Sequence, residues 1–169
     1  KTKESNQKIA ITRAGNVIGG GDWALDRIVP DCVKSWSQNE PVIVRSPEAT
    51  RPWQHVLEPL GGYLTLGAVL DTYDNLNGEA YNFGPAADQN YSVSQLINEM
   101  KKYWINVDWK SAERSNGVNS EAGLLKLNCD KALFDLRWTP ALSFEKTVKF
   151  TIDWYRTFYE EKGVKMLKF

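Results

Sequence analysis

The sequence has 169 residues, and its 21 lysine and arginine side chains balance 21 aspartates and glutamates, so the formal net charge is zero. A balanced charge gives no net field that attracts nucleic acid or an anionic membrane surface, and we expect neither as a partner. The 42% hydrophobic content suffices for one globular domain with a substantial core. No apolar run is long enough to span a bilayer and no signal peptide opens the chain, which predicts a cytoplasmic protein.

Strands and helices are predicted to alternate along the first half of the chain. Residues 8–14 indicate a strand with Ile9 and Ile11 on one face, and a loop over 15–26 follows it. Apolar residues at helical spacing over 27–38 predict a helix, which tolerates Pro30 in its first turn. Further elements are expected at 41–46 (strand), 53–56 (strand) and 57–74 (helix).

The second half continues with the clearest helix signal of the sequence. Ser92 and Gln95 have the spacing of a capping box, and the apolar residues after them recur at helical intervals. The other elements are expected at 80–84 (strand), 107–111 (strand), 130–136 (helix) and 143–161 (helix). Since parallel strands need a crossover helix between them, we expect 8–14 and 80–84 to be neighbours in one parallel sheet.

The segment GGGDWA (19–24) matches G-x-G-x-x-A, the glycine turn that holds a dinucleotide pyrophosphate. In that turn the helix begins inside the motif, so that its amino terminus faces the phosphates. Here Pro30 sets the helix start several residues beyond Gly21, and Asp22 places a carboxylate where two phosphates would lie. We therefore interpret the segment as a loop with another role, either a flexible connector or a substrate-side loop.

Few residues have the chemistry of a metal or nucleophilic site. His55 is the only histidine, so a histidine-rich metal site is excluded. Because His55 lies in an extended segment, we expect no Ser-His-Asp or Cys-His constellation. Cys32 and Cys129 fit no zinc-binding spacing, which favours buried free thiols. We expect no metal ligand and no catalytic residue in this chain.

Four segments carry a family resemblance, and they occur in this order: TRAGNVIGGGDWALDRIVPDCV, RPWQHVLEPLGGYLTLG, YNFGP and EAGLLKLNCDKA. Together they resemble the carboxyl-terminal half of the sugar-nucleotide dehydratases of the extended short-chain dehydrogenase/reductase family. The family shares an R-x-x-N-x-x-G stretch, here residues 13–19, and an Arg-x-Trp segment, here residues 51–53. The first two segments are typical of the branch that acts on CDP-glucose.

The resemblance implies an α/β fold, the carboxyl-terminal part of an NAD(P)-binding Rossmann fold with a small α/β substrate-binding lobe, in a single unit over 1–169. The family's NAD fingerprint, Tyr-x-x-x-Lys pair and acid/base residues precede these segments, and no Tyr-x-x-x-Lys spacing occurs here. We therefore expect that this chain alone binds CDP-glucose but does not catalyse a reaction. We expect NAD to be held mainly by an absent amino-terminal half.

The activity implied for the intact enzyme, expected to be a homo-oligomer, is an NAD-dependent lyase reaction. It converts CDP-glucose to CDP-4-keto-6-deoxyglucose and water, for the synthesis of deoxysugars in O-antigen-type polysaccharides. A sugar-nucleotide epimerase of the same superfamily and a non-catalytic nucleotide-sugar-binding protein remain as alternatives.

Two residues are the main substrate-binding candidates. The resemblance implies that Asn16 hydrogen-bonds the sugar nucleotide near its diphosphate; the alternative is an asparagine that caps a turn at a strand end. Arg51 matches the family's diphosphate arginine, and its planar guanidinium suits phosphate oxygens. The alternative for Arg51 is a surface ion pair.

The other substrate-binding candidates are Asp22, Trp23, Arg27, Val44, Arg45, His55 and Glu121. The first three lead from the glycine loop into the helix at 27–38, while Val44 and Arg45 belong to a strand expected along the base and ribose. Glu121 has a carboxylate that can accept from ribose hydroxyls. For Trp23 a core position is the alternative, and His55, which alternates with Trp53, is equally consistent with a partly buried histidine.

Overall fold

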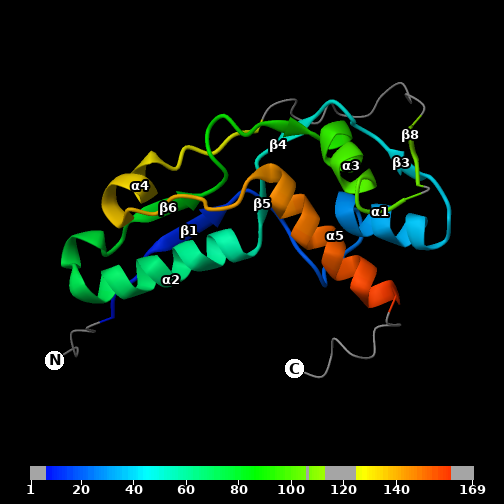
Figure 1. Ribbon diagram of the computed structural model, residues 1–169. Helices are drawn as coiled ribbons and strands as arrows, with labels where there is room; N and C mark the ends of the chain where they lie inside the picture. The colour runs from blue at the N-terminus through cyan, green and yellow to red at the C-terminus, as the bar shows by residue number, and fades with distance from the viewer. Residues whose placement is uncertain (1–6, 106, 113–124, 161–169) are drawn as a thin grey trace.

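The computed structural model describes residues 7–105, 107–112 and 125–160, which form short strand pairs flanked by helices (Figure 1). The strands are Ile11–Ala14 (β1), Asn16–Ile18 (β2), Val42–Val44 (β3), Thr50–Arg51 (β4), Trp53–His55 (β5), Ala80–Phe83 (β6), Tyr91–Ser92 (β7) and Trp109–Ser111 (β8). The helices are Ile28–Ser37 (α1), Leu57–Thr72 (α2), Val93–Lys101 (α3), Asp130–Leu136 (α4) and Phe144–Glu160 (α5), with a 3₁₀ turn at Asp74–Leu76 (η1). None of these helices is long and apolar enough to cross a membrane.

The strands pair mainly in parallel. β1 pairs with β6 in the register Ile11 to Ala80, which confirms that the segments 8–14 and 80–84 are parallel neighbours. β2 pairs in parallel with β5, β3 pairs in parallel with β8, and β4 pairs antiparallel with β7. The crossover between β1 and β6 includes α2, as right-handed βαβ connections require a helix between parallel strands.

The interpretation of residues 15–26 as one loop is wrong at β2. Only three residues long, β2 is too short to show the alternation that identifies a strand in a sequence. Its pairing partner β5 lies far along the chain. Gly15 separates β1 from β2, and a Cβ at this position would lie 2.8 Å from both Cγ and the carbonyl oxygen of Pro52. The close approach of the two chain segments thus requires a glycine here.

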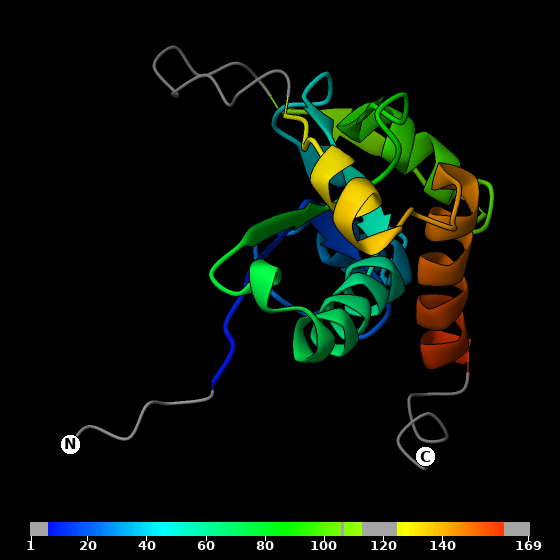
Figure 2. The same cartoon turned by 90° about the vertical axis from the view of Figure 1, so that its left-hand side faces the viewer.

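Two hydrophobic clusters hold the elements together. In the smaller one, α2 and α4 pack against the β1–β6 pair, as both views show (Figures 1 and 2). Phe83 in β6 is its centre, with edge-to-face contacts to Tyr63 and Trp138. Gln54 in β5 donates from Nε2 to the carbonyl oxygen of Phe83 at 2.8 Å, which ties this cluster to the neighbouring strand pair.

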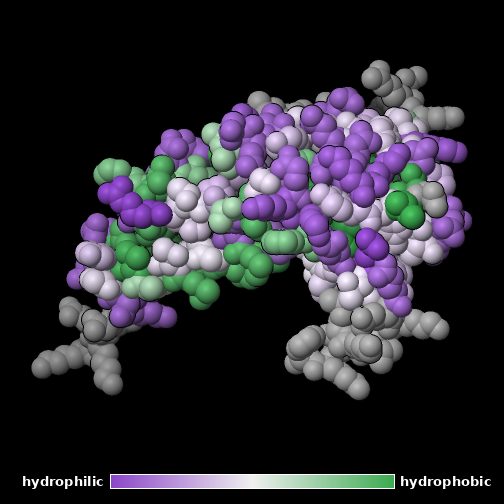
Figure 3. All heavy atoms as spheres, in the orientation of Figure 1, coloured by the Kyte–Doolittle hydropathy of each residue, from purple (hydrophilic) through white to green (hydrophobic). Residues whose placement is uncertain are grey.

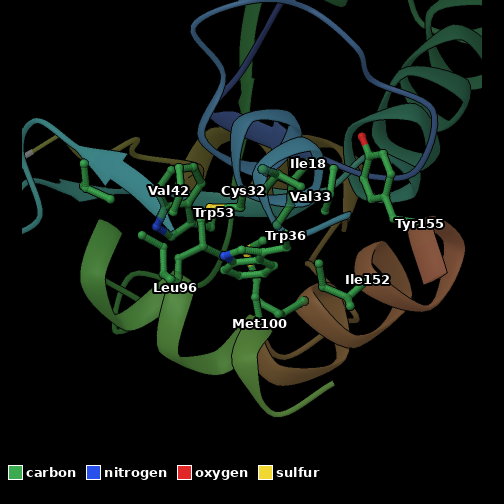
Figure 4. Close-up of a cluster of buried hydrophobic side chains, with 14 of the residues drawn as sticks. Ile18, Cys32, Val33, Trp36, Val42, Trp53, Leu96, Met100, Ile152 and Tyr155 are labelled. Carbon is green, nitrogen blue, oxygen red and sulfur yellow. The ribbon is translucent and has the colours of Figure 1, made fainter. Parts of the chain in front are cut away.

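The larger cluster unites α1, α3 and α5 with β2, β3 and β5 (Figure 4). Its fully buried side chains come from all three helices: Cys32, Val33, Trp36, Leu96, Ile97, Met100, Val148, Ile152 and Tyr155. The apolar face expected on the helix at 27–38 is therefore the one that packs inward. Both cysteines are free thiols, as expected, although Cys129 is only half-buried.

The amino terminus of α3 has the capping box that the sequence predicts. The amide of Gln95 donates to the Ser92 hydroxyl at 3.2 Å, and the Ser92 amide donates to the Gln95 side chain at 2.8 Å. A buried carboxylate, Glu58 in α2, similarly fixes the segment before α5 by accepting from the amides of Ala141 and Leu142 at 3.0 and 2.6 Å. These local contacts set where the helices begin around the larger cluster.

Candidate functional site

A cavity of about 190 Å³ opens where β2, the amino terminus of α1 and the end of β3 meet. Its lining residues are 16–19, 22, 26–31, 43–46, 51, 53 and 93. Six of the nine substrate-binding candidates line it, namely Asn16, Asp22, Arg27, Val44, Arg45 and Arg51. The fold thus brings residues from four separate chain segments to one concave surface of mixed charge, the kind of site that small ligands occupy.

Asn16 in β2 and Arg51 in β4 both line this cavity. β2 pairs with β5 so that Asn16 is opposite Trp53, which follows Arg51 by two residues. Arg51 is only 7% exposed, so its side chain is buried rather than at the surface. One guanidinium nitrogen donates to the carbonyl oxygen of Thr50 at 2.7 Å, which fixes the plane of the group at the cavity wall. A buried arginine in a cavity is suited to a phosphate or carboxylate ligand.

The amino terminus of α1 forms a second wall. Arg27 precedes the first helical residue in an extended conformation, and its side chain makes no capping hydrogen bond. Residues 27–31 line the cavity, so the uncapped first turn faces the same space as Arg51. Because the amino terminus of a helix carries a partial positive charge, this wall favours a negatively charged ligand.

The mouth of the cavity carries an exposed ion pair. Arg45, just after β3, donates to the carboxylate of Asp26 at 3.2 Å, and both side chains are mostly in solvent. Asp26 has a positive φ of 59°, a left-handed conformation that aspartate tolerates better than most residues. Asp22 accepts from the amide of Ala24 at 2.9 Å, so its carboxylate stabilises the turn of its own loop.

Trp23 does not line the cavity but contacts an aromatic group on α5. Its ring lies 5.3 Å from that of Tyr155 and 5.0 Å from that of Phe158. The hydroxyl of Tyr155 donates to the carbonyl oxygen of Asp22 at 2.6 Å, and burial raises the pKa of this tyrosine to about 12. Trp23 therefore anchors the loop that carries Asp22, but it is 36% exposed and does not take the core position that was its alternative.

His55 also lies outside the cavity lining. It is buried against the ring of Phe150 in α5, and its Nδ1 accepts from the amide of Leu57 at 3.3 Å. Burial lowers the pKa of His55, while the nearby Glu58 opposes this shift. These contacts agree with the alternative stated for His55, a histidine that is buried in the protein and not a ligand contact. Glu121, the last candidate, lies outside the described residues.

The glycines of GGGDWA serve mainly the approach of this loop to the rest of the protein. A Cβ on Gly19 would lie 2.9 Å from Cγ1 of Val56, and a Cβ on Gly20 would overlap the Trp154 ring. Gly21 has a φ of 82°, which favours glycine. Since α1 begins only at Ile28, the helix does not start inside the motif, and the rejection of a dinucleotide fingerprint is confirmed.

The sequence interpretation missed two acidic residues of this cavity, Asp26 and Asp31. Asp31 follows Pro30 in the first turn of α1. The predicted helix start therefore places Asp31 one helical turn after the candidate Arg27. That adjacency was the available signal. Within the described ranges, no group of three or more His, Cys, Asp or Glu side chains is arranged to hold a metal ion.

The fold matches solved sugar-nucleotide enzymes. UDP-glucuronic acid 4-epimerase from Bacillus cereus, in complex with UDP-glucuronic acid and NAD, superposes with a TM-score of 0.74 at 19% identity, over 90% of this chain and 46% of the epimerase. dTDP-glucose 4,6-dehydratase from Bacillus anthracis, in complex with NAD, gives 0.69 at 17%, over 89% and 45%. The chain is thus an α/β unit that matches about half of the epimerase and dehydratase structures of the extended short-chain dehydrogenase/reductase class.

The sequence comparison points to a narrower group of enzymes than the comparison of folds. Over 151 residues the chain is 40% identical to CDP-glucose 4,6-dehydratase from Salmonella typhimurium (strain LT2), which covers 88% of this chain and 41% of the Salmonella protein. The chain is therefore a homologue of CDP-glucose 4,6-dehydratase and spans less than half the length of that enzyme. No family model matches the sequence.

Proposed function

We propose that this chain supplies the CDP-sugar-binding part of a CDP-glucose 4,6-dehydratase. The observation that carries the proposal is the convergence of Asn16, Arg51 and the uncapped amino terminus of α1 on one cavity, in a homologue of that enzyme. Asn16 and Arg51 suit the diphosphate of a nucleotide sugar, and the positive end of α1 adds to the attraction of the cavity for an anionic ligand. The name of the Salmonella relative gives CDP-glucose as its substrate, and we assign the same substrate to this chain.

In this proposal the residues of the cavity bind and orient the nucleotide and do not react with the sugar. Arg51 presents its planar guanidinium to the diphosphate oxygens, and the Asn16 amide donates a neutral hydrogen bond beside it. The cytidine lies between the segments at 22–28 and 42–45, where Val44 provides an apolar surface and Arg45 a polar one. A firm grip on the nucleotide holds the sugar in a fixed orientation for the reaction.

The glycine loop of this chain does not have the geometry of an NAD-binding turn. The glycine loop that matches the dinucleotide pattern packs against Trp154 and ends well before α1 begins, so it offers no helix terminus to a pyrophosphate. We assign the cofactor, and the groups that transfer protons to the sugar, to the part of the dehydratase that this chain does not match. The complete enzyme would form CDP-4-keto-6-deoxyglucose and water for deoxysugar synthesis.

The proposal is tested by titrating the wild-type protein with nucleotide sugars in a calorimeter. CDP-glucose should bind more tightly than UDP-glucose and dTDP-glucose, and free CDP should compete with it. A clear preference for UDP-glucose or dTDP-glucose would contradict the assignment and favour a sister epimerase or dehydratase. A crystal structure with CDP should place the diphosphate beside Arg51 and Asn16.

A further inference from the structure

Three aspartates line the cavity, and two of them already have partners within the protein. Asp22 accepts from the amide of Ala24, and Asp26 pairs with Arg45. Asp31 differs from both, because no described residue donates a hydrogen bond to its carboxylate. The nearest positive charges act on it only through space, from Lys34 and Arg45.

The position of Asp31 limits what the carboxylate can meet. Asp31 lies on α1, which packs against β3. At the cavity mouth, the charge of Asp26 raises the pKa of Asp31 and the charge of Arg45 lowers it. Partial burial raises the pKa of the Asp31 carboxyl above its usual range, with Lys34 opposing the shift. A partly desolvated carboxylate without a donor is unfavourable in the free protein, and a ligand that donates a hydrogen bond to it relieves this cost.

The cavity wall around Asp31 suits a flat heterocycle. Ile28 and Val44 supply apolar surface from α1 and β3, while Arg51 lies on the separate wall formed by β4. In the function proposed above, on which this inference rests, the diphosphate takes the wall of Arg51. The base is then left to the wall of α1 and β3, where Asp31 is an acceptor to which no described residue donates.

We propose that Asp31 is the specificity-determining residue for cytosine, accepting a hydrogen bond from the exocyclic amino group of the base. Cytosine carries an N4 amino donor where uracil carries an O4 acceptor, and carboxylates recognise cytosine through this amino group. Uracil would place its O4 lone pairs against the Asp31 carboxylate. The same residue therefore attracts the correct base and repels the competing one.

The test compares the affinities for CDP and UDP of the wild type and the Asp31→Asn variant, by calorimetry. Asparagine has the same shape and can turn its NH₂ group toward uracil O4, so the preference for CDP over UDP should fall about tenfold. Asp31→Glu keeps a carboxylate acceptor and should retain most of the preference. The ratio is the measured quantity, because removing a negative charge from the cavity strengthens the binding of both anions.

Asp26→Asn is the matched control. It removes the same charge from the same cavity, but from a side chain that is committed to Arg45, so it should change both affinities by a similar factor. Thermal unfolding of each variant checks that it is folded. If Asp31 only stabilises the start of α1, Asp31→Asn would lower the thermal stability and leave the ratio of the CDP and UDP affinities unchanged.

The possible results separate this inference from the proposed function. A wild-type protein that prefers CDP, with a ratio that Asp31→Asn reduces and Asp26→Asn does not, supports the role of Asp31. A ratio that Asp31→Asn leaves unchanged overturns it, and so does a wild type that binds CDP and UDP equally, although a nucleotide-binding cavity then stands. A wild type that binds neither nucleotide overturns both.

Discussion

At the scale of one residue, Arg51 is central to the ligand binding that we propose for the cavity. The side chain is buried and lines a cavity, and its planar guanidinium can donate several hydrogen bonds to phosphate oxygens. Its hydrogen bond to the carbonyl oxygen of Thr50 keeps the guanidinium in place before a ligand arrives. Such pre-organisation reduces the entropy lost on binding.

In the intact dehydratase that we propose, Arg51→Ala should raise KM for CDP-glucose and reduce kcat much less. The lost contact is made equally with substrate and transition state, so the effect falls on binding. A hydrogen bond to a charged group contributes about 1.5–3 kcal/mol to binding, and KM should rise by the factor that corresponds to this free energy. Steady-state kinetics over a wide range of CDP-glucose concentration measures both parameters.

Arg51→Lys provides the control for charge alone. Lysine keeps the positive charge but offers a point contact in place of the planar fork, so its KM should lie between those of the wild type and Arg51→Ala. An unchanged KM in Arg51→Ala would show that Arg51 does not hold the substrate.

At the scale of elements, the loop over 19–26 takes its shape from α5. Tyr155 hydrogen-bonds the loop backbone, and Trp23 and Gly20 both lie against aromatic rings of that helix. The cavity wall that carries Asp22 and Asp26 therefore depends on a helix that does not itself line the cavity.

Gly20→Ala should destabilise the protein by about 1–3 kcal/mol, because the added Cβ overlaps the Trp154 ring and forces the loop away from α5. Urea denaturation followed by circular dichroism measures this change. Gly67→Ala is the matched control, since nothing lies within 4 Å of a Cβ at this position in α2. Alanine there should stabilise the helix by about 0.5–1 kcal/mol. Equal stabilities of the two variants would disprove the close contact.

Elements with strong local signals could be predicted from the sequence. The capping box of Ser92 and Gln95 set the start of α3, and the apolar face of α1 set its burial. β2 and β4 could not be predicted, because strands of three and two residues are defined by distant partners rather than by their own pattern.

The same limit explains what was missed in the cavity. The family motif located Asn16 and Arg51. The predicted helix start placed Asp31 near Arg27, but its position in the cavity depends on how α1 packs against β3, which no local pattern shows.

At the scale of the whole molecule, one face remains conspicuously apolar. Hydrophobic side chains gather along the part of the surface formed by β1 and α2 (Figure 3). Exposed leucines, glycines and one alanine recur at helical spacing along α2, before the exposed Asp71 near its carboxyl end: Leu57, Leu60, Gly61, Leu64, Gly67 and Ala68. Leu64 is 78% exposed. A helix that is apolar on both its inner and outer faces is typical of one enclosed on two sides.

We expect this face, called the α2 stripe here and defined by the six residues above, to be covered by further polypeptide in a complete dehydratase. This chain matches only 41% of its Salmonella relative, so a large part of that enzyme remains to provide the cover. Uncovered apolar stripes of this kind mark association surfaces. A protein of residues 1–169 alone should therefore self-associate through the α2 stripe.

Sedimentation velocity over a range of concentrations tests this prediction on the isolated chain. The double substitution Leu60→Lys and Leu64→Lys places two charges on the stripe and should shift the distribution toward monomer, because burying an unpaired charge opposes association. Phe134→Lys, at an exposed aromatic residue of α4 outside the stripe, serves as the control for added charge and should change the distribution less. A wild-type chain that stays monomeric at every concentration would show that the α2 stripe is no association surface. Self-association that responds equally to the two sets of substitutions would place the contact elsewhere.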